Sequence, residues 1–203
     1  MQEGKIRFNT VFVSNNIPSD PKIFKLKIWS QLFQKNGLTP EVKGNYTGNL
    51  SFRSRDGFVI TASGLKDKEN LGDDCFVYIK DYDEVSNTFS VEGQKKPSSE
   101  TLMHHFLYEA NQEINAVFHG HNNIIVAVAK NLKLVITEKE LESGTIELAK
   151  EVQKVSENNK LIVLRNHGFV TVGNDMKEAG ELALTSLQKA KCKLARQFSN
   201  FSC

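Results

Sequence analysis

The stretch PSSETLMHHFLYEANQEINAVFHGH, residues 97–121, joins a helical pattern to an extended one and ends in two histidines. Apolar side chains in residues 99–111 lie roughly on one helical face, and Ser98 or Ser99 is a candidate N-cap. Residues 114–121 form a short apolar run that is typical of a strand. The stretch therefore predicts a helix and then a strand, which carries His119 and His121 to its end.

The rest of the chain extends this pattern in both directions. Helical spacing predicts helices over residues 21–36, with Gly37 as a stop, and over 143–159 and 176–198. Short alternating or apolar segments between turn residues predict strands at 49–55, 57–63, 75–80 and 88–93, and two more within 160–173. Residues 123–130 form a further short apolar segment. This order predicts an α/β fold with a largely antiparallel sheet.

Length and composition place the chain in the globular class. Its 203 residues, of which 39% are hydrophobic and 25% charged, predict one domain over residues 1–203, with no role assigned to residues 1–20. A net charge of +2, without a basic run longer than two lysines, argues against a nucleic-acid partner. The chain has neither a signal-peptide pattern nor an apolar run of ~18 residues, so we expect no membrane contact.

Cysteine usage indicates the compartment. Cys75, Cys192 and Cys203 are odd in number and widely spaced, which suits free thiols better than a disulfide framework. Free thiols are typical of a reducing compartment. We therefore expect a cytoplasmic protein.

The His-Gly-His triplet is a candidate metal site. Residues two apart in an extended segment project to the same side, so the imidazoles of His119 and His121 can reach one ion. A catalytic site usually takes a third protein ligand, and His167 lies in a turn directly after an apolar strand. His104 and His105 fall on a predicted helix and are not expected to be ligands. On spacing alone, two polar histidines at a strand end are the more common case for such a triplet.

Three further clusters have both a functional and a plain interpretation. Ser98, Ser99 and Glu100 open a predicted helix, where they could favour an anion or simply cap the helix. The segments GNYTGNLSFR (residues 44–53) and ITASG (60–64) could cradle a phosphate or simply form turns.

Taken together and in order, these segments resemble one known family. GNLSFR, ITASG, the block from Lys96 to His121, SGTIELAKEV, LRNHGFVTVG and EAGELALTSLQKAKCKLA resemble the class II aldolase/adducin family over roughly residues 26–195. The resemblance is most specific in the Ser-Ser-Glu to His-x-His block and in Asn-His-Gly. The best-known sugar enzymes of this family are the L-fuculose-phosphate aldolases, which the chain resembles.

The resemblance implies a role for each matching residue. His119, His121 and His167 would bind one divalent ion per chain, usually Zn²⁺, with Mn²⁺ or Co²⁺ as alternatives. Glu100 matches the acid/base residue of the family's aldolases. The phosphate of the substrate would be held by residues that match the family's phosphate site, namely Asn49, Ser63, Gly64, Ser98 and Ser99.

The implied activity is that of a metal-dependent aldehyde-lyase. It would cleave a ketose 1-phosphate, as the fuculose-phosphate aldolases do, to dihydroxyacetone phosphate and an aldehyde through a metal-stabilised enediolate. Two alternatives remain open: an epimerase or dehydratase that uses the same ion, and a non-catalytic module like the adducin head, which lacks the metal histidines. Here all three histidines and Glu100 are present, and glutamate at this position favours the aldolases over the epimerases.

The family also carries expectations about architecture. Its fold has three layers, with helices on both sides of a mainly antiparallel central sheet, and its members are commonly homotetramers with active sites between subunits. One departure stands out: the interval between His121 and SGTIELA is shorter than the family's, and no match for the residues that complete a neighbouring site lies there. The resemblance therefore implies a sugar phosphate as substrate without naming the aldehyde.

Overall fold

The computed structural model describes residues 5–199, which form a nine-stranded sheet in the order β1-β7-β6-β5-β4-β8-β11-β10-β9. Its strands are β1 (Asn9–Ser14), β4 (Asn49–Ser54), β5 (Gly57–Thr61), β6 (Phe76–Asp83), β7 (Thr88–Glu92), β8 (Ala116–Gly120), β9 (Val135–Ile136), β10 (Leu161–Leu164) and β11 (Gly168–Gly173). A separate hairpin joins β2 (Glu41–Val42) to β3 (Asn45–Tyr46). The helices are α1 (Ile23–Lys35), α2 (Thr101–Ala110), α3 (Asn123–Val128), α4 (Ile146–Ser156), α5 (Met176–Ser199) and the 3₁₀ turn Asp73–Cys75.

The sheet is mixed, which corrects the expectation of a mainly antiparallel one. The six pairings from β7 through to β10 are antiparallel, whereas both edge strands, β1 and β9, pair in parallel with their neighbours. The crossover through α4 returns the chain so that β10 runs in the same direction as β9. β1 lies within the N-terminal segment to which the sequence assigned no role, and its partner β7 is distant along the chain.

The predicted helices are confirmed, with two local differences. Thr145 caps α4, because its Oγ1 accepts a hydrogen bond from the N–H of Leu148 at 3.2 Å. The expected cap of α2 by Ser98 or Ser99 is wrong: the N-cap residue is Glu100, and no side chain caps this helix. The apolar segment at 123–130 contains the short helix α3.

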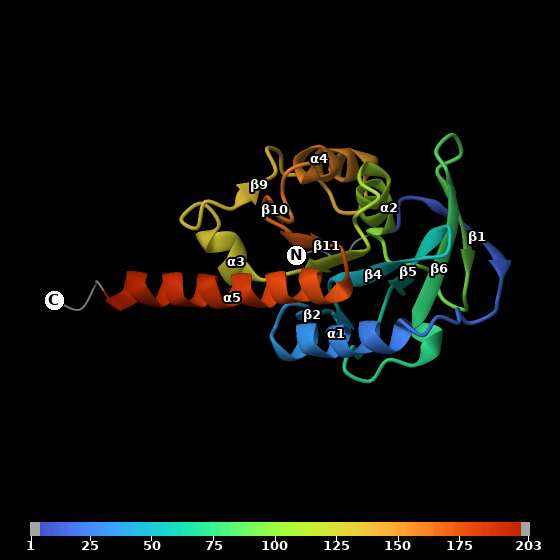
Figure 1. Cartoon of the computed structure of the whole chain (residues 1–203), viewed down its shortest axis with the longest axis horizontal. Helices are drawn as coiled ribbons and strands as arrows, with labels where there is room; N and C mark the ends of the chain where they lie inside the picture. Colours follow the sequence, from blue (N-terminus) through green and yellow to red (C-terminus); the bar gives the residue numbers. More distant parts are fainter. Residues whose placement is uncertain (1–4, 200–203) are drawn as a thin grey trace.

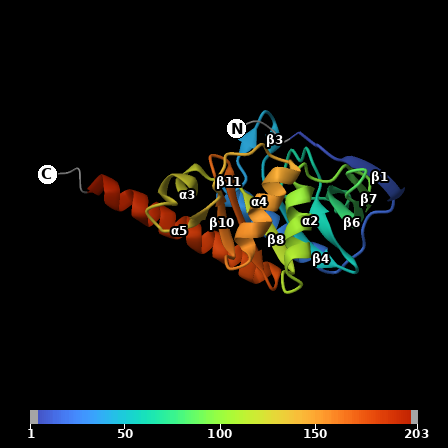
Figure 2. The same cartoon turned by 90° about the horizontal axis from the view of Figure 1, so that it is seen from above.

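Helices pack against both faces of the sheet, and β8 shows how its residues divide between them. Figures 1 and 2 place α2 and α4 on one side and α1 and α5 on the other. Phe118 faces α1, with its ring centroid 5.4 Å from that of Phe33 and 5.9 Å from that of Trp29. Its neighbour His119 points to the opposite face, because side chains alternate along a strand. Among residues 5–199, no helix has both the length and the apolar character needed to cross a membrane.

The contact between α1 and α5 depends on a glycine. A Cβ atom added to Gly180 would lie 2.3 Å from Cζ3 of Trp29, so the indole ring occupies the space that any larger residue needs. Trp29 also packs against Phe118, so the ring cannot shift away from α5 without loosening that contact. Close approach of the two helices thus requires the absence of a side chain at position 180.

We expect Gly180→Ala to lower the free energy of unfolding by about 1 kcal/mol. Alanine stabilises a helix by about 1 kcal/mol relative to glycine, whereas overpacking costs about 1–3 kcal/mol. The steric cost should outweigh the helix preference, because the Trp29 ring lies against Gly180 on one side and packs against Phe118 as well. Urea unfolding would measure the change. Lys189→Ala, at an exposed position of the same helix, should stay within about 0.5 kcal/mol of wild type. A Gly180→Ala variant at least as stable as wild type would contradict this account.

Candidate functional site

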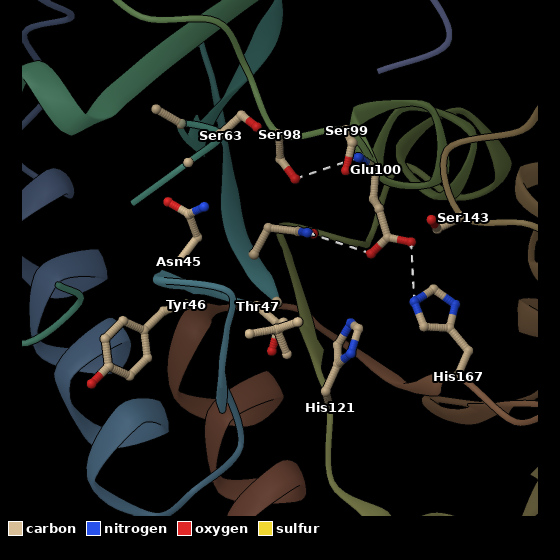
Figure 3. A pocket seen from close by; sticks show the side chains of 15 residues that line it. Asn45, Tyr46, Thr47, Ser63, Ser98, Ser99, Glu100, His121, Ser143 and His167 are labelled. Carbon is tan, nitrogen blue, oxygen red and sulfur yellow. Dashed lines mark hydrogen bonds and ion pairs between the residues drawn. The ribbon is translucent and has the colours of Figure 1, made fainter. Parts of the chain in front are cut away.

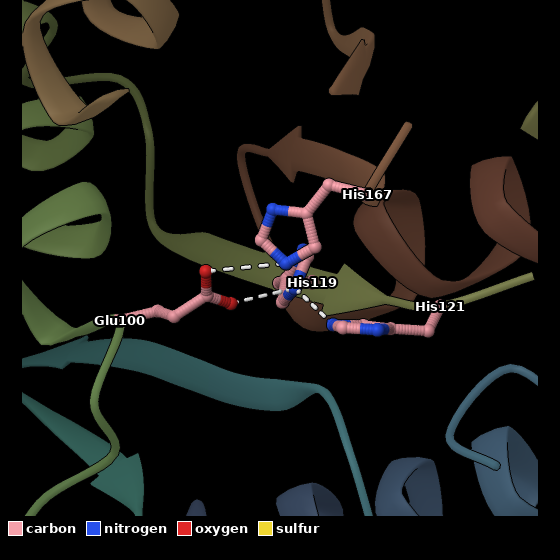
Figure 4. A group of neighbouring side chains, drawn as sticks. All are labelled: Glu100, His119, His121 and His167. Carbon is pink, nitrogen blue, oxygen red and sulfur yellow. Dashed lines mark hydrogen bonds and ion pairs between the residues drawn. The ribbon is translucent and has the colours of Figure 1, made fainter. Parts of the chain in front are cut away.

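Three imidazoles and a carboxylate meet at the carboxyl end of β8 (Figure 4). His119 is part of β8, His121 follows the strand, His167 lies in the turn between β10 and β11, and Glu100 precedes α2. One candidate ligand atom from each of these residues lies within 4.8 Å of the others. The structure thus brings together the four residues that the sequence analysis singled out, from three separate segments.

The distances within this cluster are short. Nε2 of His119 lies 2.6 Å from Oε2 of Glu100 and 2.8 Å from Nε2 of His121. Nε2 of His167 lies 3.5 Å from Oε1 of Glu100. The three nitrogens and the carboxylate therefore converge on one small volume, as the ligands of a single cation do.

Close backbone packing around Gly120 fixes the path of the chain between His119 and His121. A Cβ atom at Gly120 would lie 2.7 Å from Cζ of Phe169 and 2.9 Å from the carbonyl oxygen of Leu38, so only glycine fits between the histidines. The N–H of His121 then donates to the same carbonyl of Leu38 at 2.7 Å. This bond holds the chain in place just beyond the strand and keeps both imidazoles on the cluster side.

The hydrogen bond made by Nδ1 determines the tautomer of His119. Nδ1 lies 2.8 Å from the carbonyl oxygen of Phe169, which can only accept, so Nδ1 must carry the hydrogen. In the neutral ring, Nε2 then presents a lone pair to the cluster. A histidine whose outer nitrogen donates to a backbone carbonyl is the usual arrangement of a metal ligand.

The donor set fits a divalent cation. Oε1 of Glu100 is buried and has no hydrogen-bond partner among the described residues, and Nε2 of His119 and of His121 face each other at 2.8 Å. The lone pair of His119 Nε2 also lies 2.6 Å from Oε2 of Glu100, and two electron-rich atoms this close need a positive charge between them. A cation held by imidazole and carboxylate would satisfy all of these atoms at once.

Burial sets the protonation states of the cluster. It lowers the pKa of His121 well below the usual value and lowers that of His167, so both rings are neutral near pH 7. Burial by itself raises the pKa of Glu100, but the nearby imidazoles of His119 and His167 more than offset it and hold this pKa well below the usual range. Neutral imidazoles and an ionised carboxylate are the forms that bind metals.

A small polar pocket opens beside the cluster (Figure 3). Its volume is about 60 Å³, and His121, His167 and Glu100 form part of its wall. All five residues proposed from the resemblance for phosphate binding line it: Asn49, Ser63, Gly64, Ser98 and Ser99. Ser98 Oγ accepts a hydrogen bond from the N–H of Glu100 at 3.4 Å, so its O–H can still donate to a ligand.

Other residues that line this pocket were not named individually from the sequence, although Asn45, Tyr46 and Thr47 lie within the segment 44–53 that it indicated. The hairpin of β2 and β3 turns at Lys43 and Gly44, both with positive φ, and brings Asn45 and Tyr46 to the wall. Thr47 and Ser143 complete it, as Figure 3 shows. Both positions lie outside regular strands and helices, where sequence periodicity gives no signal.

A buried chain of hydrogen bonds runs from α2 to the cluster. Ser51 Oγ lies 2.8 Å from the hydroxyl of Tyr108 and 2.6 Å from Nδ1 of His104, whose Nε2 lies 2.6 Å from Oδ1 of Asn49. The amide nitrogen of Asn49 in turn donates to Glu100 at 3.5 Å. Burial lowers the pKa of His104 to about 3, so the ring is neutral and donates to Oδ1. His104 therefore fixes which end of the Asn49 amide faces Glu100.

His104 and His105 thus have different surroundings. His104 is fully buried within the network, whereas the ring of His105 packs 4.9 Å from that of Tyr82 and 5.7 Å from that of Phe89. Neither belongs to the Glu100 cluster. The alternation of polar Asn49 and Ser51 with apolar Leu50 and Phe52 in β4 is the sequence signal that could have revealed the network.

Lys68 supports the pocket from beneath. Its side chain is almost completely buried, and Nζ donates to the carbonyl oxygens of Thr47, at 2.9 Å, and of Gly48. These two residues lead directly into Asn49 and line the pocket. Burial lowers the pKa of Lys68 to about 7. The loop before β4 is therefore held by an amine that nothing in the sequence singled out.

We expect Lys68→Met to weaken the rise of stability with pH. The pKa of Lys68 is about 7 in the folded chain and 10.5 in the unfolded one, so between these values the unfolded state binds more protons and raising the pH favours folding. Lys68 adds at most about 1.4 kcal/mol per pH unit to the slope of the free energy of unfolding against pH. Urea unfolding of wild type and variant between pH 7 and pH 9.5 would measure the difference in slope.

Lys66→Met provides the matched control, because Lys66 is exposed and only two residues away. This variant should keep the wild-type pH dependence. Equal slopes in wild type and Lys68→Met would show that Lys68 keeps an ordinary affinity for its proton in the folded chain.

Comparison with known proteins identifies the family. Residues 28–194 match the class II aldolase and adducin N-terminal domain. The L-fuculose phosphate aldolase of Methanococcus maripaludis is 35% identical over 150 residues, which cover 65% of this chain and 76% of that protein. The methylthioribulose-1-phosphate dehydratase of Citrobacter koseri is 28% identical over 159 residues, covering 65% and 76%.

A solved structure of an L-fuculose 1-phosphate aldolase has the same fold, with a TM-score of 0.71 and 23% identity over 92% of this chain and 90% of that one. The chain belongs to the class II aldolase and adducin N-terminal domain family. Within that family its named relatives include sugar-phosphate aldolases and a dehydratase. The cluster described above is of a kind that suits a divalent metal.

Proposed function

We propose that this protein is a divalent-metal-dependent class II aldolase. It would cleave a ketose 1-phosphate to dihydroxyacetone phosphate and an aldehyde. One observation carries the proposal: three imidazoles and Glu100 converge beside a small pocket that is lined by hydroxyl and amide side chains. Such an arrangement offers a place for a metal, an acid/base group and an anion within reach of one small molecule.

His119, His121 and His167 would hold the ion, and Glu100 lies near enough to add a ligand in the absence of substrate. Zn²⁺ is the ion that we propose, with Mn²⁺ or Co²⁺ as alternatives for three imidazoles. When bound, the ion supplies positive charge that stabilises the negative charge developing on the substrate oxygens as the carbon–carbon bond breaks.

Glu100 would move the proton. In the cleavage direction, the substrate hydroxyl on the carbon that becomes the aldehyde loses its proton, and the electron pair of the broken bond stays on the three-carbon fragment. Glu100 can accept the first proton and return one to that carbon, because its Oε1 has no hydrogen-bond partner in the described chain. The amide of Asn49 donates to the other oxygen and so helps to hold the carboxylate in place.

The small pocket would hold the phosphate. Hydroxyl groups of Ser63, Ser98 and Ser99 and the amide of Asn49 supply donors without a buried charge that the ligand would have to displace. The amine of Lys68 lies behind the loop and adds a positive charge when it is protonated. Holding the phosphate end fixes the reacting carbons next to the cluster.

A dehydratase is the second candidate, because one relative bears that name. It would use the same cluster, and removal of a proton beside a carbonyl is common to both reactions. An adducin-like interaction module is disfavoured, since the three histidines and Glu100 are all present and brought together. We further propose that the protein acts as a cytoplasmic homotetramer, on the pattern of the family.

Metal content and cleavage, measured on the same preparation, test the proposal. We expect one metal per chain and release of dihydroxyacetone phosphate from at least one member of a panel of ketose 1-phosphates. His121→Ala should lose most of the metal and at least ~100-fold in cleavage rate, because loss of a ligand costs more than loss of an outer partner. His105→Ala should keep both, since His105 lies outside the cluster.

The outcomes separate the candidates. Bound metal with loss of water from the substrate, and no dihydroxyacetone phosphate, would indicate the dehydratase. Wild-type metal content in His121→Ala would contradict the ligand assignment. Absence of metal from the wild-type protein purified and reloaded with Zn²⁺ would contradict the proposal as a whole.

A further inference from the structure

A second and much larger cavity opens on the other side of the cluster. Its volume is about 690 Å³, against about 60 Å³ for the small pocket, and both cavities share His121, Ser143 and His167. A substrate with its phosphate in the small pocket and its reacting carbons at the cluster would extend into this second cavity. The walls of the cavity therefore meet the part of the substrate that becomes the aldehyde.

These walls are charged and polar. Apart from the three shared residues, they comprise Lys5, Arg7, Glu140, Leu141, Glu142, Arg165 and Asn166. Only one of these seven side chains, that of Leu141, is aliphatic. An apolar group would gain little here, because it would remove water from charged side chains without offering them a partner.

Of the five charges in the wall, only those of Arg7 and Glu142 neutralise each other, and Glu140, whose partner is a neutral amide, is exposed to solvent. Arg7 binds Glu142, with 2.5 Å between Nη2 and Oε2, and Glu140 accepts a hydrogen bond from the side chain of Asn166 at 2.7 Å. Lys5 is exposed to solvent. The charge that is both partly buried and uncompensated is that of Arg165.

Arg165 is held in a defined position. Its Nε donates to the carbonyl oxygen of Thr137 at 3.1 Å, and its backbone N–H donates to Oγ1 of the same residue at 2.9 Å. No hydrogen bond or ion pair joins its two terminal nitrogens to any residue between 5 and 199. The guanidinium is thus anchored at one end and offers its remaining donors, two residues along the chain from His167.

We propose that Arg165 binds a carboxylate at the far end of the aldehyde portion of the substrate. A fixed guanidinium presents two parallel N–H donors whose spacing matches a carboxylate, which a lysine or a neutral donor cannot reproduce. The inference rests on the proposed aldolase function and adds the class of aldehyde to it. It also separates this chain from the relative named for methylthioribulose 1-phosphate, whose methylthio group is apolar.

The aldol direction tests this with a matched pair of aldehydes. The Zn²⁺-loaded protein would be given dihydroxyacetone phosphate and either succinic semialdehyde or butyraldehyde, which have four carbons each and differ in the terminal carboxylate. We expect kcat/KM to be at least ~10-fold higher for succinic semialdehyde, which is the discrimination typical of a charged hydrogen bond. Equal values, or a preference for butyraldehyde, would overturn the inference.

Variants of Arg165 assign the preference to this side chain. In Arg165→Met the ratio of kcat/KM between the two aldehydes should fall to about one. Arg165→Lys should give an intermediate ratio, because lysine keeps the positive charge but lacks the two parallel N–H donors. Arg55→Met, which removes an exposed arginine outside the cavity, should keep the wild-type ratio. If Arg165→Met does not fold, Arg165→Lys decides the question. An unchanged ratio in Arg165→Lys would overturn the role of the two parallel N–H donors.

A separate measurement keeps this inference distinct from the proposed function. Exchange of a C3 proton of dihydroxyacetone phosphate with solvent deuterium, followed by NMR, needs the cluster, Glu100 and the small pocket but no aldehyde. Without exchange, the proposed function itself fails. With exchange but without the carboxylate preference, the aldolase function stands and the inference about Arg165 is wrong.

Discussion

The antiparallel pairing of β8 between β4 and β11 is the constraint on which the site depends. This register sets His119 opposite Asn49 on one side and Val170 on the other, and brings the carbonyl of Phe169 to Nδ1 of His119. A slip of one residue would turn His119 toward α1 and bury Phe118 against Glu100. The aromatic packing of Phe118 against α1 and the polar contacts of His119 therefore specify the same register from opposite faces.

The polar side chains buried around this strand are stable there only because they hydrogen-bond to one another. Asn49, Ser51, His104 and Tyr108 are almost completely buried, and each hydrogen-bonds to another member of the set. Such a network is costly when incomplete and rigid when complete. Its rigidity holds the Asn49 amide beside Glu100, whose Oε1 has no hydrogen-bond partner among the described residues and lies next to the converging imidazoles. The contrast indicates that the network is built to present a cation site.

Much of this could be predicted from the sequence because the signals are local. Helical periodicity and turn residues located the helices and the central strands, and the two-residue spacing of His119 and His121 placed both rings together. Other features had no local signal. The edge strand β1 gains its partner from residues some 80 positions away, and the cap expected at Ser98 or Ser99 falls at Glu100 instead. Lys68 and Arg165 look like ordinary surface cations until the loops around them are folded.

The sequence by itself determined which residue types are available, the order of the elements, and the resemblance that singled out Glu100, His119, His121 and His167. Only the tertiary structure decided that these four meet within 4.8 Å, that Lys68 is buried beneath the loop of Thr47 and Gly48, and that Arg165 faces a large polar cavity. The physical reason is that patterns along the chain report local conformation and the face that is buried. Distances between segments, the dielectric environment of a charge and the partners it lacks arise only when distant segments pack together.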